Sequence, residues 1–411
     1  MVENYIPQIR FKGFSGAWEI SQLKFIAEIN PKSDLPDEFI YVDLESVKGT
    51  ELINSRLENK SSAPSRAQRL AQKNDIFYQT VRPYQKNNYL FDRTDTNYVF
   101  STGYAQLRPI CDSNFLINVF QREPFVQSVL DQCTGTSYPA INSNNLAEIE
   151  INVPRNPKEQ KAIGSYFKNL DNQITLKQRN LDKLVTLKKA MLEKMFPKEG
   201  ADEPEIRFKG FSGAWELKTL GDIVDLENGF AFKSKYFQKN ESATIVLTPG
   251  NVHLGGGFQH GKGQFYDENY LSKIPSKFIF EPNDLFITMT DLTPTAQALG
   301  FPALVPSDGN TYLHNQRLGK LVNFDGDGSF LVNFLSTNNY QRKIISTASG
   351  TTVKHTSPSK VLGCEVYIPK LDEQQAIGSF FKKLDALISL QKTELTKLKQ
   401  IKSSCLEKMF V

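Results

Sequence analysis

The sequence predicts an α+β fold in which two mixed α/β globular domains are joined by two long helices, packed as an antiparallel coiled coil. Three observations predict it. A segment of 11 residues occurs twice, a helical segment of 37 residues occurs twice, and the stretches between them combine short apolar runs with Asn, Ser and Gly turns. Because internal repeats dominate any assignment of architecture, we interpret the chain as a tandem repeat with pseudo-twofold symmetry.

The shorter repeat, which we call the opener, reads IRFKGFSGAWE. It occupies residues 9–19 and, without a single change, residues 206–216. Both tryptophans of the chain, Trp18 and Trp215, lie inside it. Two copies separated by a whole globular segment are not typical of a solenoid and indicate two similar halves.

The longer repeat covers residues 160–196 and 374–410, which are identical at 20 of 37 aligned positions. With Ile163 and Ile377 at heptad position a, eight of the ten a and d positions are apolar in each copy. This spacing puts the apolar residues on one helix face. A helix of this length spans roughly 55 Å and cannot bury such a stripe alone. The other copy is the nearest partner, although a coiled coil between chains is an open alternative.

Short strands are expected between the repeats. Residues 74–78 (NDIFY) resemble residues 283–287 (NDLFI), a turn that enters an apolar strand in each half. Residues 100–107 are expected to form one strand with a kink at Gly103. Otherwise the two middle regions differ strongly, which indicates a shared frame that carries two unlike surfaces.

Composition favours a folded protein without a membrane span. Hydrophobic residues make up 39% of the chain, with 29 Phe and 15 Tyr, and no run of 18 consecutive apolar residues occurs. The first residues lack the basic and apolar regions of a signal peptide. Four scattered cysteines without a CxxC pair are typical of reduced thiols. We therefore expect a cytoplasmic protein.

The net charge of +4 is concentrated in the two helical segments. Residues 157–198 contain 10 Lys and Arg against 4 Asp and Glu, and residues 370–411 contain 8 against 5. The globular regions are slightly acidic. Since nucleic-acid binding usually leaves a basic footprint, DNA binding by this chain would depend on local patches or on a partner subunit.

Sequence motifs for catalysis and metal binding are not found. The stretch from Gly256 to Gly263 approaches a phosphate-binding loop but ends in Gly where the hydroxyl residue is needed, so a Gly-rich surface loop is expected. The four histidines show no metal-ligand spacing, and no serine lies in a nucleophile elbow. We expect no catalytic residue, no metal site and no cofactor in this chain.

Several loops combine side chains that can contact base edges or phosphates. An ordinary solvated loop is the alternative for each of them. The candidate DNA-binding residues of these loops are Arg82, Tyr84, Gln85, Lys86, Lys233, Lys235, Thr290, Thr293, Lys354 and His355.

The chain resembles the specificity subunit of type I restriction–modification systems over essentially its whole length. The resemblance depends on the duplicated opener, on the stretch GTSYPAIN at residues 135–142, and on the Glu-Gln pair that begins each long helical segment, at residues 159–160 and 373–374. The second half departs from this pattern, because residues 354–357 read KHTS where the first half has PAIN.

The resemblance implies two target recognition domains, each of which recognises one half of a bipartite DNA target, with the helices setting the spacer. It adds Ser137, Tyr138 and Asn142 to the candidate DNA-binding residues. It also implies a non-catalytic chain that docks two methylation subunits and, for restriction, motor–nuclease subunits. S-adenosylmethionine, ATP and Mg would belong to those partners. The candidate partner-binding residues are Lys168, Lys177, Arg179, Lys382, Lys383 and Lys392.

A structural scaffold with two protein-binding heads on a coiled-coil spacer is the alternative function. The expected divisions are target recognition domain 1 at residues 1–156, helix 1 at 157–197, a linker at 198–205, target recognition domain 2 at 206–371, and helix 2 at 372–411.

Overall fold

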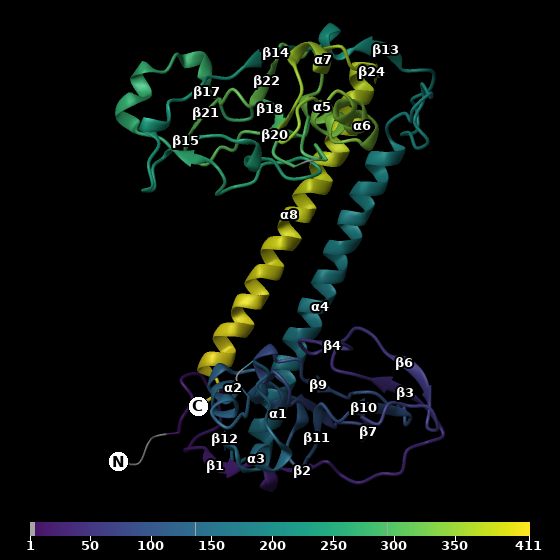
Figure 1. The fold of residues 1–411 in the computed structure, drawn as a ribbon, viewed down its shortest axis with the longest axis vertical. Helices are drawn as coiled ribbons and strands as arrows, with labels where there is room; N and C mark the ends of the chain where they lie inside the picture. Colours follow the sequence, from purple (N-terminus) through teal and green to yellow (C-terminus); the bar gives the residue numbers. More distant parts are fainter. Residues whose placement is uncertain (1–4, 136, 294) are drawn as a thin grey trace. The chain divides into compact units, whose positions relative to one another are not determined.

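The computed structural model describes residues 5–135, 137–293 and 295–411, which form two compact units (Figure 1). Unit 1 comprises Met1–Arg179 and Lys392–Val411, and unit 2 comprises Asn180–Gln391. Each unit therefore combines a globular domain of mixed helix and strand with a portion of both long helices. The sequence-based prediction of two mixed α/β domains is confirmed.

Two four-stranded sheets form the body of unit 1. The first has the order β6–β3–β10–β7 and consists of β3 (Glu38–Val42), β6 (Arg56–Asn59), β7 (Ala67–Leu70) and β10 (Tyr98–Ser101). The second has the order β2–β11–β8–β9 and consists of β2 (Ala27–Ile29), β8 (Ile76–Gln79), β9 (Tyr89–Leu90) and β11 (Tyr104–Pro109). Two small antiparallel pairs are β1 (Glu19–Gln22) with β12 (Glu150–Val153), and β4 (Val47–Lys48) with β5 (Glu51–Leu52).

The expectation of one strand over residues 100–107 was wrong. The chain turns sharply after Ser101, and the segments on either side, β10 and β11, belong to different sheets. A Cβ at Gly103 would lie only 2.8 Å from Cδ1 of Leu44, so a larger residue in this tight turn would force the Leu44 side chain to shift. The glycine therefore marks the end of a strand and not a kink within one.

Two short helices in unit 1 begin with a side-chain cap, Asp112 in one and Asn142 in the other. Asp112 accepts a hydrogen bond from the N–H of Phe115, 2.8 Å away, at the start of α1, which satisfies one of the free amides at a helix N-terminus. The helices are α1 (Ser113–Phe120), α2 (Glu123–Leu130) and α3 (Ser143–Glu148), with single 3₁₀ turns at η1 (Leu23–Phe25) and η2 (Pro83–Gln85).

Unit 2 repeats this plan with shorter strands and more 3₁₀ turns. One sheet has the order β14–β22–β18–β20 and consists of β14 (Asp225–Asn228), β18 (Leu285–Thr288), β20 (Pro302–Leu304) and β22 (Leu318–Val322). The other has the order β16–β15–β21–β17 and consists of β15 (Thr244–Val246), β16 (Gln264–Phe265), β17 (Ile279–Phe280) and β21 (Thr311–Leu313). Its two-stranded pairs are β13 (Glu216–Thr219) with β24 (Glu365–Ile368), and β19 (Thr290–Asp291) with β23 (Lys354–His355). Its helices are α5 (Gly328–Leu335), α6 (Asn338–Ser346) and α7 (Pro358–Leu362), and its 3₁₀ turns are η3 (Leu220–Asp222), η4 (Ser234–Tyr236), η5 (Pro249–Asn251), η6 (Glu268–Lys273) and η7 (Ser276–Phe278). The Gly-rich stretch at 256–263 lies in a loop between η5 and β16.

The two long helices are α4 (Pro157–Lys194) and α8 (Leu371–Lys408). Within each unit the segments of α4 and α8 are joined by ion pairs. In unit 1, the α4 residue that is later in the sequence pairs with the α8 residue that is earlier, so the two segments run antiparallel. The ion pairs are Asp171–Lys402 (2.5 Å) and Lys177–Glu394 (2.5 Å) in unit 1, and Lys188–Asp385 (2.6 Å) in unit 2.

These ion pairs explain three of the four polar exceptions in the heptad pattern, the fourth of which is Gln391. Lys177, Lys188 and Lys402 occupy a or d positions, where a bare ammonium would oppose packing, and each has a carboxylate on the facing helix. Both helices also carry many charged residues outside this stripe. None of the described helices is both long enough and apolar enough to cross a membrane.

A tryptophan from each opener anchors the core at the end of a long helix. In unit 1, Trp18 meets Phe410 edge-on, with ring centroids 6.1 Å apart at 84°. In unit 2, Trp215 meets Phe196 at 6.2 Å and 85°. All four rings are buried. The identical openers therefore perform the same packing task in the two units.

Candidate nucleic-acid interface

A cleft of about 480 Å³ lies in unit 1, next to the β4–β5 hairpin. Its other wall is formed by residues 80–88, which follow β8 and which we call the Arg82 loop. Three predicted DNA-binding residues, Arg82, Gln85 and Tyr138, line this cleft. The structure therefore brings together residues that are more than fifty positions apart in the sequence.

Backbone pairing brings the Arg82 loop to Tyr138. Val81 forms a β-bridge with Ala140, and the N–H of Arg82 donates to the carbonyl oxygen of Pro139 at 2.7 Å. The Arg82 guanidinium then lies over the Tyr138 ring, 4.3 Å from its centroid. Arginine on an aromatic face is an attractive cation–π arrangement that also fixes the plane of the guanidinium.

The backbone of the Arg82 loop is unusual at both ends of η2. Arg82 and Lys86 have φ angles of 53° and 54°, in the left-handed region that long side chains rarely adopt. Strain of this kind costs about 1–3 kcal/mol per residue and often marks functional loops. Here Arg82 lines the cleft, and Lys86 forms an ion pair with Glu123 at 2.5 Å.

The other predicted residues of unit 1 have mixed surroundings. Tyr84 and Ser137 are exposed, as is the ring of Tyr138, at 63%. Asn142 caps α3, because its Oδ1 accepts the N–H of Asn145 at 2.8 Å. Its side-chain oxygen thus has a structural partner, and a role in DNA binding remains a prediction for Asn142.

Sequence reasoning missed part of the cleft. Lys48 and Glu45, from the region of the β4–β5 hairpin, and Gln79, from the end of β8, also line it. The two hairpin residues look like ordinary solvated charges in the sequence, and Gln79 looks like part of an apolar strand. The sequence signal for this part of the cleft is the local alternation of acidic and basic residues in the β4–β5 hairpin.

Unit 2 has the same frame with different side chains. The pairing of Thr290 with His355 in unit 2 corresponds, position by position in the repeat, to the bridge between Val81 and Ala140 in unit 1. The position of Arg82 is therefore taken by Asp291. Thr290 and Asp291 pair with His355 and Lys354, so four of the predicted residues, Thr290, Thr293, Lys354 and His355, come together around this strand pair.

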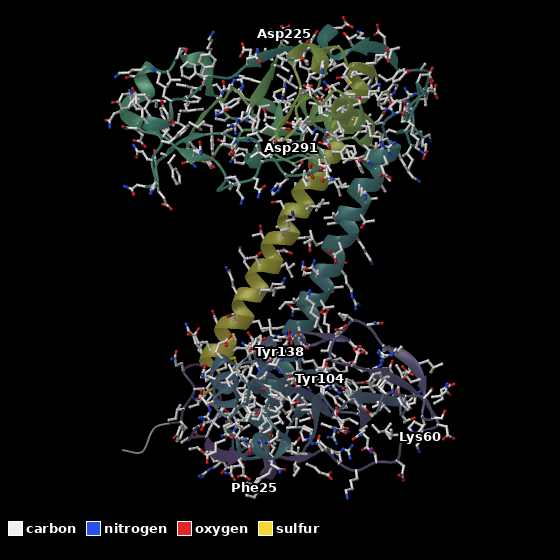
Figure 2. All side chains as sticks on the ribbon, in the orientation of Figure 1. Phe25, Lys60, Tyr104, Tyr138, Asp225 and Asp291 are labelled. Atoms are coloured by element: carbon white, nitrogen blue, oxygen red, sulfur yellow. The ribbon has the colours of Figure 1, made fainter. Side chains whose placement is uncertain are left out.

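Asp291 organises this site from within (Figure 2 labels Asp291 and, in unit 1, Tyr138). Its side chain is buried, and its carboxylate accepts hydrogen bonds from the N–H and hydroxyl of Thr293 at 2.8 and 2.7 Å and from the N–H of Ala298 at 2.7 Å. Lys354 donates to the carbonyl oxygen of Gly350 at 2.7 Å. Because internal partners occupy these groups, this surface differs chemically from that of unit 1.

Lys233 and Lys235 belong to a different part of unit 2. Both are exposed at η4, and the ammonium of Lys235 lies 4.8 Å from the ring centroid of Tyr236. The aromatic residues around η4 pack with β15, β17 and β21, not with the β19–β23 pair. The structure thus separates these two lysines from the other candidates in unit 2.

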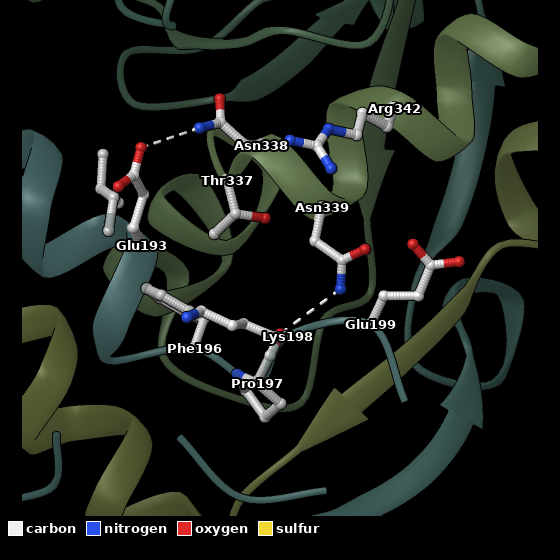
Figure 3. Close-up of a pocket in the computed structure, with 10 residues that line it drawn as sticks. Glu193, Phe196, Pro197, Lys198, Glu199, Thr337, Asn338, Asn339 and Arg342 are labelled. Atoms are coloured by element: carbon white, nitrogen blue, oxygen red, sulfur yellow. Dashed lines mark hydrogen bonds between the residues drawn. The ribbon is translucent and has the colours of Figure 1, made fainter. Parts of the chain in front are cut away.

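A second kind of pocket lies where each long helix ends. In unit 2 a pocket of about 440 Å³ is lined by the end of α4 and the start of α6 (Figure 3). Asn338 donates to Glu193 at 3.1 Å and Asn339 to the carbonyl oxygen of Pro197 at 3.3 Å across it. In unit 1 a pocket of about 650 Å³ is lined by the end of α8 and the start of α2. The two pockets occupy matched positions, with Leu192 in one and Leu406 in the other.

The predicted partner-binding residues fall into two groups. Lys168 forms an ion pair with Asp92, and Lys177 forms the one with Glu394 described above, so both have intramolecular roles. The other four residues, Arg179, Lys382, Lys383 and Lys392, are exposed. Among residues 5–135, 137–293 and 295–411 the structure shows no cluster of three or more His, Cys, Asp or Glu side chains that could hold a metal ion.

Comparison with known proteins gives a consistent result. The family described as the type I restriction modification DNA specificity domain matches the chain twice, at residues 16–186 and 213–400. The MjaVIII specificity subunit of Methanocaldococcus jannaschii is 25% identical over 288 residues, which cover 68% of this chain and 65% of that protein. The EcoBI specificity subunit of Escherichia coli is 24% identical over 188 residues, or 46% of this chain and 35% of that protein. The matches thus span just under two thirds of the first of these relatives and about one third of the second.

Solved structures share the fold. The S subunit of a type I restriction–modification system from M. genitalium is 15% identical and covers 99% of both chains, with a TM-score of 0.56. A structure that describes complex assembly and conformational transition of a type I R-M system is 19% identical, covers 95% of this chain and 97% of that chain, and has a TM-score of 0.54. At these identities the likeness concerns the two-domain architecture.

Proposed function

Since this chain belongs to the family of type I restriction modification DNA specificity domains, we propose that it is the DNA specificity subunit of a type I restriction–modification complex. Each globular domain recognises one half of a bipartite DNA target. The chain contains two copies of the family domain, which is the number that two half-sites require. The complex acts in the cytoplasm, where its DNA is found.

One observation carries this proposal: matched positions of the two copies have unlike chemistry. Arg82 occupies the end of one β-bridge, and the buried carboxylate of Asp291 occupies the same place in the other copy. The two copies share the opener and the long helical segment, whereas the loops between them differ in sequence. A pair of domains that recognised the same sequence would need no such difference, because side-chain type decides which base edge is contacted.

We infer that the two long helices form an antiparallel coiled coil, that the chain has pseudo-twofold symmetry, and that the helices set the spacer between half-sites. The ion pairs at Lys177 and Lys188 support this arrangement in the two units separately. Seven residues added to α4 between 181 and 187, with seven added to α8 between 386 and 392, would retain these pairs. Such an insertion lengthens a helix by about 10 Å, equal to at most about three base pairs of DNA. The expected result is a longer spacer with both half-sites unchanged, whereas altered half-sites would refute the role of the helices.

The partners in this proposal are two methylation subunits, together with motor–nuclease subunits for restriction. The matched pockets at the ends of α4 and α8 support two equivalent docking positions. The exposed residues Arg179, Lys382, Lys383 and Lys392 extend the available polar surface. The chain itself is non-catalytic, and S-adenosylmethionine, ATP and Mg are bound by the partners.

A domain exchange tests the proposal. Residues 20–150 are replaced by the equivalent segment of another specificity subunit, and the modified bases of a host that expresses the chain with its methylation subunits are sequenced. One half of the recognised sequence should change while the other half stays the same. A change in both halves, or in neither, would contradict the assignment of one half-site to each domain.

A DNA titration separates this function from a scaffold with two protein-binding heads. Binding to duplex DNA is measured at several salt concentrations, with and without the methylation subunits. A specificity subunit should show an affinity that falls steeply and linearly on a logarithmic scale as salt rises, because phosphate contacts release counterions. Absence of DNA binding in the complete complex would favour the scaffold.

A further inference from the structure

Arg82 differs from two other arginines of unit 1 that lie over tyrosine rings. Arg56 and Arg93 each bind a carboxylate in addition to the ring. For the Arg82 guanidinium no hydrogen-bond acceptor is found among the residues that the structure describes. The Arg56 guanidinium lies 4.7 Å from the Tyr41 ring and 2.6 Å from Asp43, whereas that of Arg93 lies 5.0 Å from the Tyr98 ring and 3.0 Å from Asp95.

The Arg82 guanidinium is thus held in position while its donors remain available. Its Cζ atom lies over the Tyr138 ring, 4.3 Å from the ring centroid, and its backbone is held by the hydrogen bond to Pro139 at 2.7 Å. Pro83 follows it and restricts the chain further. A donor group that is already oriented loses little conformational freedom when a ligand binds.

The rest of the wall also presents hydrogen-bond donors. The amide oxygen of Gln85 accepts from Nε2 of Gln79 at 2.8 Å, and the amide oxygen of Asn87 accepts from the N–H of Gly49 at 2.8 Å. Since both oxygens are used internally, the amide groups of Gln85 and Asn87 have their NH₂ donors left for the cleft. A ligand that fits here must offer hydrogen-bond acceptors.

Guanine meets this requirement better than the other bases. Its edge in the major groove carries two adjacent acceptors, N7 and O6, and arginine binds both in a two-point contact. Adenine offers one acceptor beside a donor, and cytosine offers a donor. Glu45, which also lines the cleft, has the acceptor chemistry that suits the amino group of the paired cytosine.

We propose that Arg82, positioned by Tyr138, recognises a guanine through the major groove in the half-site of the first domain. This inference rests on the proposed function. At the matched position of the second domain, the carboxylate of Asp291 is occupied by internal hydrogen bonds, so this guanine contact belongs to one half-site alone. Tyr138 acts as a positioning residue, because it holds the guanidinium and not the base.

Arg82→Lys is the decisive variant, because it keeps the positive charge but removes the planar two-point donor. The full chain is expressed with its methylation subunits in a host without the system, and modified bases are sequenced across the genome. The preference for guanine at one position of one half-site should fall on the order of 10- to 100-fold, while the other half-site is unaffected. An unchanged base preference would overturn the proposal.

Matched variants separate recognition from folding. Arg93→Lys changes another arginine over a tyrosine in the same unit and should leave both half-sites unchanged. Tyr138→Phe should retain the guanine preference, and Tyr138→Ala should weaken it. Because the Tyr138 ring is 63% exposed, its removal leaves the core intact, and this variant decides the question if Arg82→Lys does not fold.

The wild-type complex tests the proposed function independently of the inference about Arg82. If the wild-type complex modifies no bipartite sequence, the proposed function fails. If it does, and Tyr138→Ala and Arg82→Lys both retain the guanine preference, the inference about Arg82 alone is wrong. Should Arg82→Lys abolish modification, binding of the purified complex to four duplexes that differ at this base pair decides. Equal binding to all four supports the proposal, and a retained guanine preference contradicts it.

Discussion

Arg10 and Glu159 form a two-point ion pair, in which Nε and Nη2 of the arginine donate to the two carboxylate oxygens at 2.7 and 2.8 Å. The glutamate side chain is only 2% exposed. Through this pair the opener of unit 1 is attached to the first turn of α4. Arg207 and Glu373 make the same contact in unit 2, with both distances 2.7 Å. The Glu-Gln motif of the long helices is therefore explained by structure, because its acid neutralises the opener arginine.

Removal of Arg10 should destabilise unit 1 strongly. Arg10→Ala leaves the buried carboxylate of Glu159 without its partner, a change that typically costs about 3–5 kcal/mol. Urea unfolding followed by the fluorescence of Trp18, in a Trp215→Phe background, measures the free energy of unfolding of this unit. Arg155→Ala serves as control, because its pair with Glu19 is exposed on both sides and should contribute less than about 1 kcal/mol. Similar losses for both variants would contradict the importance of burial.

Gly164 is expected to tolerate no side chain. A Cβ at this position of α4 would collide with Oδ1 of Asp112, the atom that caps α1, and would lie 2.7 Å from the N–H nitrogen of Phe115. Gly164→Ala should therefore lower the free energy of unfolding by about 1–3 kcal/mol, despite the better helix propensity of alanine. Gly328→Ala in unit 2, with no atom within 4 Å of the new Cβ, is the control and should be neutral or slightly stabilising in a urea titration followed by Trp215 in a Trp18→Phe background. A stabilised Gly164→Ala variant would refute the close approach.

The repeated parts of this fold could be predicted from the sequence, as could the matched strands β8 and β18, but most strand ends in the middle parts could not. The helix pattern is local, since apolar residues at heptad spacing identify a face without any knowledge of the partner. Strand ends depend on tertiary contacts instead. The turn at Gly103 separates strands that belong to two different sheets and packs against Leu44, which is far away in the sequence, and so the prediction of one continuous strand was wrong.

The same distinction holds for the candidate site. Residues such as Arg82 and Tyr138 have side-chain types that suit nucleic acids, but their proximity depends on the bridge between Val81 and Ala140. Lys48 lines the cleft because the β4–β5 hairpin forms one of its walls, and the charge alternation of the hairpin does not show which residues lie opposite. The predicted DNA-binding and partner-binding residues therefore remain predictions for mutational tests, although several of them share one cleft.

His314 should make unit 2 sensitive to acid. Burial, with a smaller contribution from the charge of Lys320, lowers the pKa of His314 to about 4. The hydrogen bond from Nε2 to the carbonyl oxygen of Leu318 at 3.0 Å and the charge of Asp284 raise the pKa but do not offset burial. In the unfolded chain the group titrates near 6.5. The folded state therefore binds this proton only at lower pH.

The contribution of neutral His314 is complete above pH 6.5 and is lost as the pH falls from 6.5 toward 4. The full effect amounts to about 3 kcal/mol by the usual relation between pKa and free energy. Urea unfolding between pH 4 and 7 should show a flatter pH dependence for His314→Gln than for the wild type. His260→Gln, at an exposed position, should leave the curve unchanged. A His314→Gln curve that parallels the wild type would show that other groups dominate the acid response.

A circular permutant tests whether the ends of the chain are equivalent to the internal junction. The N–H of Ile9 donates to the carbonyl oxygen of Lys408 at 2.9 Å, and that of Ile206 donates to Lys194 at 2.9 Å. After residue 411 is joined to residue 1, eleven residues separate Lys408 from Ile9, the same number that separates Lys194 from Ile206. The closed chain therefore repeats the register of its own internal connection.

The permutant is opened between Glu199 and Gly200, where the backbone is exposed, so no core contact is cut. It should unfold cooperatively and modify the same bipartite sequence as the starting protein, measured by sequencing of modified bases. A second permutant, opened within α4 between Asp182 and Lys183, should lose activity, because it interrupts a helix whose seam contacts lie on both sides of the cut. If the first permutant failed while the second succeeded, the equivalence of the two junctions would be refuted.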